Sequence, residues 1–210
     1  MRQFALALGA TLTMLTCCQS FAPIVLGKRF TVSSLDMYVS TATPFHHTAI
    51  RTRDIELAIN FYSLLDFVVE TKFLAGSVRA AWLQQKDQGG RIELIEVPSS
   101  MRNEPEGTRQ RAIDLIQRPD LLGLNHYAID VTKSMKSKGM KRLQDWIDQI
   151  NVKSEEKFGK TLRIAIPPQE QMIGQHLYQL AFIYDADGAI IELLYQQRRF
   201  QQEMISGWYV

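Results

Sequence analysis

Cysteine is almost missing from this chain of 210 residues, which contains only Cys17 and Cys18. Both lie in an N-terminal segment that we expect to be removed, so the mature chain has no thiol for a disulfide or a nucleophile. Long hydrophobic runs are scarce as well. The apolar run from Phe4 to Leu15 is too short to cross a bilayer as a mature helix, and we expect no membrane span in the mature form.

An excess of charge of one sign is also missing. The formal net charge is +2, and the first 44 residues carry Arg2, Lys28 and Arg29 against Asp36, which accounts for all of it. The remaining chain is neutral and lacks the basic footprint of a nucleic-acid-binding protein. With 46% hydrophobic and 22% charged residues, the sequence is typical of a globular protein that buries a core.

The N-terminus has the features of a targeting signal. Residues 1–20 combine a basic start, an apolar run and the small residues Cys18 and Ser20 before a cut at Phe21. Residues 21–44 are basic and rich in hydroxyl groups, as transit peptides are. The Phe-Ala-Pro after the cut resembles the junction of two-part presequences that route proteins into plastids (chloroplasts). We therefore expect a plastid protein, with plain secretion as the alternative.

The rest of the chain contains an internal repeat. The segments "HHTAI" and "NHYAI" each place a His two residues before Ala-Ile, and each precedes apolar residues at helical spacing, over Ile55–Leu65 and Met140–Ile150. Asp54 is the expected N-cap of the first helix. The copies close with "GGRIELIEV" and "DGAIIELL", in which a Gly-containing turn leads into a β-rich run. The repeated unit is therefore a strand, a helix and about three strands.

The repeat divides the chain into segments. Residues 45–196 form one domain, with a first module at 45–99, a connector at 100–121 and a second module at 122–196. A short helix is expected over about 108–117 in the connector, whose arginines we interpret as a solvated linker rather than an anion site. The tail at 197–210 has apolar residues at four-residue spacing. It is expected to cover an exposed sheet edge or to make a homodimer contact.

Two histidines and two glutamates occupy equivalent places in the copies: His47 pairs with His126, and Glu93 pairs with Glu192. A carboxylate between two aliphatic residues is costly to bury without a cation or donor. Two imidazoles and two carboxylates suit a divalent metal of borderline softness, with two exchangeable positions if it is six-coordinate. Strand alternation would place the neighbouring His46 on the opposite face, away from this set.

At these residues the chain resembles the vicinal-oxygen-chelate superfamily, which includes glyoxalase I. The resemblance rests on "HHTAIRTRD", "RIELIEV", "GLNHYAIDV" and "DADGAIIELL" and covers about Phe45–Gln196. It implies an α+β fold in which two βαβββ modules form a curved, open mixed sheet around one metal site. The His/Glu/His/Glu set is similar to that of bacterial-type glyoxalase I, a lactoylglutathione lyase. That similarity implies one divalent ion (Ni, Co, Zn, Mn or Fe) and a small-molecule substrate, such as a glutathione adduct of a 2-oxoaldehyde.

The resemblance also implies roles for individual residues. Glu192 matches the base that moves the substrate proton, and Glu93 could serve on the opposite face of the substrate. Arg51 matches an arginine that grips the glutathione carboxylate, its alternative role being an ion pair on the strand face. Val97 and Leu122 stand where glyoxalases make further glutathione contacts, and neither side chain can bind a carboxylate or amide. The resemblance therefore implies the class of chemistry and does not specify the substrate.

Other interpretations stay open at this point. The same superfamily contains ring-cleaving dioxygenases and epimerases, and it contains members that only bind a metal or a ligand. The segment 160–178, with Pro167, Pro168, Gly174 and His176, is either a lid over the site or an insert that packs on the partner module.

Overall fold

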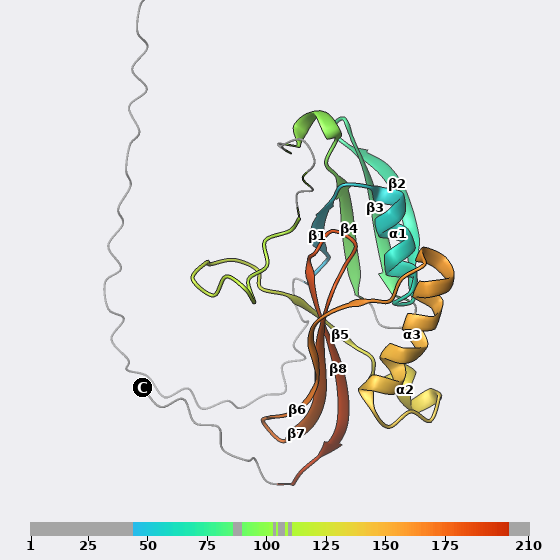
Figure 1. The fold of residues 1–210 in the computed structure, drawn as a ribbon, viewed down its shortest axis with the longest axis vertical. Helices are drawn as coiled ribbons and strands as arrows, with labels where there is room; N and C mark the ends of the chain where they lie inside the picture. The colour runs from blue at the N-terminus through green and yellow to red at the C-terminus, as the bar shows by residue number, and fades with distance from the viewer. Residues whose placement is uncertain (1–43, 86–89, 103, 105–107, 109–110, 202–210) are drawn as a thin grey trace, which may run out of the picture. The chain divides into compact units, whose positions relative to one another are not determined.

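The computed structural model describes residues 44–85, 90–102, 104, 108 and 111–201, which form two modules of one design (Figure 1). The first consists of β1 (Thr48–Thr52), α1 (Ile55–Ser63), β2 (Phe67–Ala75), β3 (Val78–Gln85) and β4 (Arg91–Glu96), followed by the short 3₁₀ helix η1 (Ser99–Met101). The second consists of β5 (Tyr127–Asp130), α2 (Thr132–Ser137), α3 (Leu143–Phe158), β6 (Arg163–Ile173), β7 (His176–Tyr184) and β8 (Ile190–Arg199).

Each module forms its own four-stranded mixed sheet. The strand orders are β1-β4-β3-β2 and β5-β8-β7-β6, and the first and last strands of each module run parallel. The equal orders confirm the repeat, and the expected α+β fold of two βαβββ modules is confirmed with it. The sheets are open, so β1 and β5 are edge strands.

Helix α1 begins and packs as its sequence predicts. The Asp54 carboxylate accepts hydrogen bonds from the backbone N–H groups of Glu56 and Leu57, both at 3.0 Å, which satisfies donors that the first turn leaves free. The residues at helical spacing bury one face, including Ile55 and Tyr62. After the helix, Asp66 takes a positive φ of 62° and turns the chain into β2.

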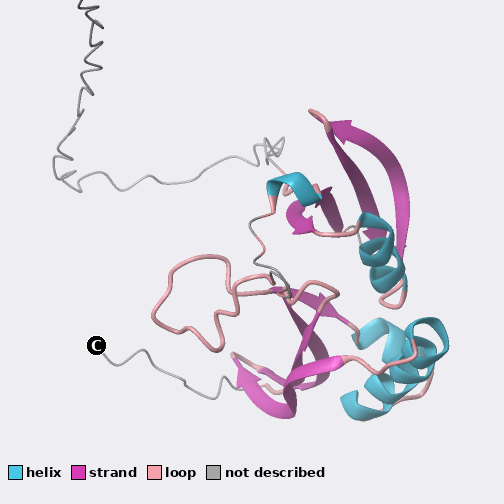
Figure 2. Cartoon of the chain, turned by 45° about the horizontal axis from the view of Figure 1, so that its top comes forward, coloured by secondary structure: helices cyan, strands magenta, loops and turns pink. Residues whose placement is uncertain are grey.

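The helical part of the second module is split into two pieces. Helix α3 begins at Leu143, buries Trp146 and Ile150, and ends at Gly159, which takes the left-handed conformation at φ 65°. The shorter α2 precedes it and buries Met135. In Figure 2, α1 lies beside the first sheet, and α2 and α3 lie together beside the second. The Lys157 ammonium donates to the Ser63 hydroxyl at 2.9 Å, so the end of α3 meets the end of α1.

Alternation along the closing strands separates the two sheet faces. In β4, Ile92 and Leu94 are 4% and 0% exposed and join the core, while Glu93 between them points to the other face. In β8, Ile191 and Leu193 are both 0% exposed and flank Glu192 in the same way. One core unites the inner faces of both modules with their helices.

Polar contacts also join the modules. The Thr52 hydroxyl at the end of β1 donates to Asp187 Oδ2 at 2.6 Å, and the Arg53 backbone N–H donates to the same oxygen at 3.2 Å. Asp187 lies in the turn between β7 and β8, so this turn of the second module holds the end of the first strand. Thr52 and Asp187 are both buried.

Several expectations change in the structure. The connector helix is absent from the described residues 111–117, where Asp114 instead caps a single turn by accepting from the Ile116 and Gln117 N–H groups. Segment 160–178, expected to be a lid or an insert that packs on the partner module, is mostly strand instead, because β6 and β7 form a hairpin that turns at Gly174. Strand β8 runs to Arg199, past the expected start of the tail.

Two parts of the sequence-based interpretation lie outside the described residues. Residues 1–43, with the expected signal and transit segments, are not described, and neither is the tail beyond 201. Among the helices that are described, none has both the length and the apolarity needed to cross a bilayer.

Candidate functional site

His47 and Glu93 form a close pair in the first module. In the parallel register Glu93 lies beside Ala49 of β1, and His47 precedes Ala49 by two residues. His47 Nε2 lies 3.1 Å from Glu93 Oε2. The Trp82 indole N–H donates to the other carboxylate oxygen at 3.3 Å and so orients it. The Glu93 side chain is 14% exposed and that of His47 is 29% exposed, so a solute can reach the imidazole.

His126 and Glu192 form the equivalent pair in the second module. Glu192 lies beside Ala128 of β5 in the parallel register. His126 Nε2 lies 3.0 Å from Glu192 Oε2, and the two side chains are 33% and 13% exposed. The edge of the Phe182 ring packs against the imidazole, with ring centroids 5.1 Å apart. The two modules therefore present the same pair with the same geometry, as the repeat predicts.

The proton positions at the second pair follow from its other neighbour. His126 Nδ1 faces the amide oxygen of Asn125 at 2.8 Å, and this oxygen can only accept, so Nδ1 carries the proton. In the neutral imidazole Nε2 then has a lone pair, and this nitrogen lies close to the acceptor-only carboxylate of Glu192. Two lone pairs at this distance repel unless a proton or a cation lies between them.

His46 does not lie on the opposite face, and the expectation from alternation was wrong. Strand β1 begins only at Thr48, so the two histidines precede the strand and its alternation does not apply. His46 Nδ1 lies 2.7 Å from His47 Nδ1, and the His46 ring packs edge-on against Trp82 with centroids 5.2 Å apart. His46 therefore belongs to the surroundings of the first pair.

A chain of hydrogen bonds runs through these residues in one direction. Glu70 holds Arg91 through two bonds of 2.7 Å, and Arg91 Nη1 reaches His46 Nε2 at 2.6 Å. Because a guanidinium only donates, His46 Nε2 accepts and its proton lies on Nδ1. That proton is donated to His47 Nδ1, so the His47 proton lies on Nε2, which is 3.1 Å from Glu93 Oε2. The chain of bonds therefore places a proton, and not a lone pair, on the His47 nitrogen nearest Glu93.

The structure pairs the four predicted ligands but does not gather them. Within the described part of the chain, no three His, Cys, Asp or Glu side chains are close enough together to hold a metal ion. Two ligands of one ion lie about 3 Å apart when bonds of about 2.1 Å meet at a right angle. Each pair has this spacing, so each fits half of a metal site.

Arg51 lies in a cavity of about 670 Å³ that also contains His126. Val97 and Leu122, the two apolar residues at expected glutathione-contact positions, line the same cavity. Among the described residues, Arg51 makes no hydrogen bond or ion pair, so the strand-face ion pair considered for it is not formed. The cavity is large enough for a small organic substrate.

The connector contributes residues to this cavity that the sequence reasoning assigned to a solvated linker. Arg102 and Arg111 line it, and Glu104 pairs with Arg53 at 2.8 Å. The Arg102 Nε atom is buried and has no hydrogen-bond partner among the described residues. The cluster of arginines in the connector was the feature of the sequence that could have indicated a site. The folded path of the connector is what brings Arg102 and Arg111 to the cavity.

A buried polar cluster beside the second pair was also missed. The hydroxyl groups of Tyr62 and Tyr127 are hydrogen-bonded, and the Tyr62 hydroxyl donates to Asp185 Oδ2 at 3.0 Å. Burial raises the pKa of both tyrosines, and burial likewise raises the pKa of Asp185. Tyr127 follows His126 directly, so the cluster connects the module boundary to the second pair.

Several solved structures are similar to this one. A glyoxalase family protein from Bacillus cereus superposes with a TM-score of 0.51 at 15% identity, over 77% of this chain and 99% of that chain. A glyoxylase/bleomycin resistance protein/dioxygenase domain from Frankia sp. superposes with a TM-score of 0.48 at 18% identity, over 74% of this chain and 99% of that chain. The trypanothione-dependent glyoxalase I of Leishmania major superposes with a TM-score of 0.42 at 19% identity, over 73% of this chain and 87% of that chain. No protein-family model matches the sequence, and no curated protein does.

Proposed function

We propose that this chain, whose fold is that of the glyoxalase or vicinal-oxygen-chelate superfamily, is a metal-dependent lyase or isomerase of the glyoxalase I type. Its substrate is a small oxo compound or the thiol adduct of a 2-oxoaldehyde. The four ligands of one divalent ion are His47, Glu93, His126 and Glu192.

The observation that carries this proposal is the second His–Glu pair. His126 Nε2 and Glu192 Oε2 lie 3.0 Å apart, and Asn125 holds the ring proton on the other nitrogen. Metal-binding histidines typically donate their second ring N–H to an oxygen acceptor, which points the free lone pair at the ion. The donor set and its orientation therefore fit a metal such as Zn²⁺ or Ni²⁺.

The reaction needs a base near the substrate carbon and a group that holds the substrate. When bound, the ion would act as a Lewis acid that stabilises negative charge on the substrate oxygens. Glu192 is the proposed base that takes the proton from carbon and returns it to the neighbouring carbon, and Glu93 is positioned for the opposite face. Arg51, which has no partner among the described residues, would bind a substrate carboxylate in the cavity.

The two half-sites are proposed to meet between two copies of the chain. Both histidines lie just before edge strands, β1 and β5, and both are partly exposed. In a symmetric dimer, the His47–Glu93 pair of one copy would face the His126–Glu192 pair of the other. This arrangement explains why each pair is well formed although the described chain gathers only two ligands at a time.

A second candidate function is a module that binds a small ligand without a metal. It is favoured by the first pair, in which the chain from Arg91 through His46 leaves the proton of His47 on Nε2, the nitrogen that a metal would need free. Other chemistry of the same superfamily, such as ring cleavage or epimerisation, needs the same ion. Oxygen uptake with Fe²⁺ would distinguish ring cleavage from proton transfer.

The test begins with metal content. Purified protein is expected to bind about one divalent ion for each set of two His and two Glu ligands, and the double variant His47→Ala/His126→Ala should lose it. Protein reloaded in turn with Ni²⁺, Co²⁺, Zn²⁺, Mn²⁺ and Fe²⁺ is then assayed with methylglyoxal and glutathione. Absence of a bound ion would favour the binding module, and a bound ion without isomerisation would favour another superfamily substrate.

A further inference from the structure

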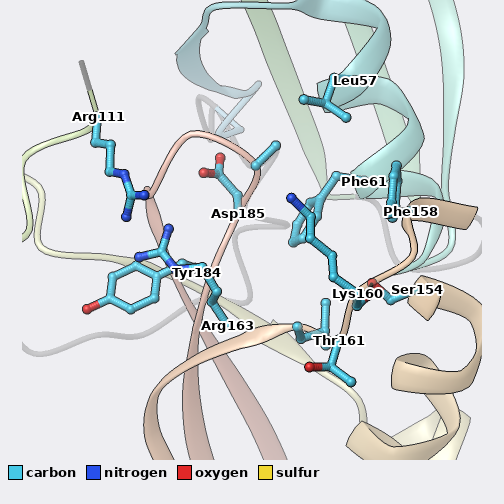
Figure 3. Close-up of a pocket in the computed structure, with 12 residues that line it drawn as sticks. Leu57, Phe61, Arg111, Ser154, Phe158, Lys160, Thr161, Arg163, Tyr184 and Asp185 are labelled. Carbon is cyan, nitrogen blue, oxygen red and sulfur yellow. Dashed lines mark hydrogen bonds between the residues drawn. The ribbon is translucent and has the colours of Figure 1, made fainter. Parts of the chain in front are cut away.

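A second cavity, of about 110 Å³, lies beside the helices (Figure 3). Its walls come from α1, from the end of α3 and the start of β6, and from the end of β7. None of the residues in the two His–Glu pairs lines it. One side of the cavity is apolar, formed by Leu57, Phe61, Phe158 and Leu162.

Three cationic side chains border the same space: Arg111 of the connector, Lys160 after α3 and Arg163 of β6. Figure 3 shows them reaching it from different segments. Among the described residues, none of the three forms an ion pair with a carboxylate. The Arg163 guanidinium lies over the Tyr184 ring, 4.4 Å from its centroid, so its plane is held while its N–H groups remain available.

Asp185 is the one carboxylate among the lining residues, and its oxygens are already used. Oδ1 accepts from the backbone N–H groups of Asp187 and Ala189 at 2.9 and 2.8 Å, and Oδ2 accepts from the Tyr62 hydroxyl at 3.0 Å. Burial raises the pKa of Asp185, which reduces its value as a counterion. Among the described residues, no other carboxylate lines the cavity, so the three cationic side chains, which are exposed to solvent, are available to bind an anion.

The position of Arg111 is set by backbone contacts. The next residue, Ala112, donates its N–H to the Asp187 carbonyl oxygen at 3.0 Å, and the Tyr184 hydroxyl donates to Asp114 Oδ2 at 2.5 Å. Gly188 has a φ of +95°, and a Cβ there would lie 3.6 Å from the Arg111 Cβ. The connector is thus attached to the β7–β8 turn through Ala112 and to the end of β7 through Asp114.

We propose that this cavity binds a small carboxylate with an apolar body, such as an aryl or short alkyl acid. Cations that converge without counterions favour an anion, and the apolar wall favours a hydrocarbon part over a fully hydrated ion. The space of about 110 Å³ is smaller than a cavity of about 150 Å³ that holds a benzene ring, so the site takes at most about one ring. This binding site is separate from the proposed metal chemistry and stands whether or not that chemistry is correct.

Benzoate is the probe for this proposal. Full-length protein labelled with ¹⁵N is titrated with benzoate, and the backbone amides of Phe158, Lys160 and Leu162 are followed by NMR. Saturable shifts with one site per chain are expected. Benzyl alcohol, which has a similar shape but no charge, should bind at least about tenfold more weakly because it lacks the charge-assisted hydrogen bonds.

Charge-removing variants separate this site from general surface attraction. Arg163→Gln and Lys160→Gln should each weaken benzoate binding by about tenfold or more. The matched control is Arg198→Gln, since Arg198 also lies over an aromatic ring, that of Phe200 at 4.9 Å, but does not line the cavity. The melting temperature of each variant checks that it folds.

Three outcomes would overturn the proposal. One is a lack of benzoate shifts at the three amides, and another is equal weakening by Arg198→Gln and Arg163→Gln. The third comes from a titration with inorganic phosphate. If phosphate binds as tightly as benzoate, the apolar wall contributes nothing and the ligand class proposed here is wrong.

Discussion

His47 and His126 occupy equivalent places in the two modules, yet their second ring nitrogens face different partners. His47 Nδ1 receives a proton from His46, whereas His126 Nδ1 donates its proton to Asn125. In the neutral rings, Nε2 of His126, the nitrogen nearest its glutamate, therefore carries the lone pair, whereas Nε2 of His47 carries the proton. The strands of the two modules are therefore equivalent, but the tautomers of their histidines are not.

This asymmetry can be measured in metal-free protein. The ¹⁵N chemical shifts of the ring nitrogens should show a proton on Nδ1 in His46 and His126, and on Nε2 in His47. Arg91→Ala should release His46 to exchange between tautomers, because no donor then occupies its Nε2. His126 is the internal control, as Arg91 does not contact it. A His46 ring with its proton on Nε2 in the unchanged protein would contradict the chain of bonds.

Glu192→Gln separates catalysis from folding. The amide has the shape of the carboxylate but is not a base, so turnover should fall by at least about a hundredfold. In metal-free protein the free energy of unfolding should not fall, because the amide N–H can donate to the lone pair on His126 Nε2. Steady-state kinetics and urea unfolding measure the two effects. The exposed Glu156→Gln on α3 is the control, and unchanged turnover in Glu192→Gln would remove this residue as the base.

At the scale of elements, the turn between β7 and β8 has a larger role than its length indicates. Its carboxylates reach the end of β1 through Asp187 and the buried tyrosines through Asp185. The connector is attached to the same turn through Ala112. The turn therefore links both modules and the path between them.

Asp185 makes the stability of this junction depend on pH. Burial raises its pKa, so folding favours the protonated form. The stabilisation from that proton is fully present below the pKa of this carboxyl in the unfolded chain, near 3.8. It is lost as the pH rises through the higher pKa of the folded protein. Asp185→Asn does not titrate and keeps an oxygen for the two backbone N–H groups. The free energy of unfolding of the variant, relative to the unchanged protein, should therefore increase with pH across that window.

Urea unfolding measures this difference at a series of pH values from about 3 to 7. This series brackets the usual pKa values of carboxyl groups. Asp120→Asn is the control, because the Arg118 guanidinium lowers the pKa of that exposed carboxyl, and its difference should run in the opposite direction. A flat difference for Asp185→Asn would mean that burial does not penalise the charge.

The elements themselves could be predicted to different degrees. The start of α1 follows from local chemistry, since Asp54 caps the helix and the apolar spacing selects its buried face. The connector was predicted to contain a helix over about 108–117 because Pro105, Gly107 and Pro119 bracket that stretch, but residues 111–117 contain only a turn. There, contacts with the β7–β8 turn outweigh local helix propensity. The β6–β7 hairpin was missed because Pro167 and Pro168 favour loops, whereas here they lie at an irregularity in the strand pairing.

At the scale of the whole molecule, mixing two inactive variants tests where the metal site is assembled. His47→Ala and His126→Ala chains, coexpressed with different tags and purified as a mixed dimer, would contain one intact and one doubly defective set of ligands if the site forms between copies. Metal content, measured by mass spectrometry, should then recover to about half of the unchanged value, because one of two sites is complete. Homodimers of each variant are the controls. If the mixture binds no more metal than the homodimers, the site forms within one chain.

Targeting is also a property of the whole chain, and it remains a proposal. Residues 1–44 fused to a fluorescent reporter should deliver it to the plastid, and Phe21→Ala should stop it earlier on the route. The control is Phe45→Ala in a reporter fused to residues 1–50. Phe45 lies beyond the proposed presequence, so this change should not alter delivery. Reporter in the culture medium would support secretion instead.

The amino-acid sequence by itself determined the repeated module, the start of α1 and the two equivalent His–Glu sets. These depend on the order of residues over short stretches: caps, apolar periodicity and strand alternation. Tertiary structure alone decided that His46 joins the first pair, that the connector arginines reach the cavities and that the β7–β8 turn holds β1. In each case the partners are far apart in the chain or lie just outside a regular element, such as His46 before Thr48. There the contacts that the packed core permits, and not local periodicity, set the position of the side chain.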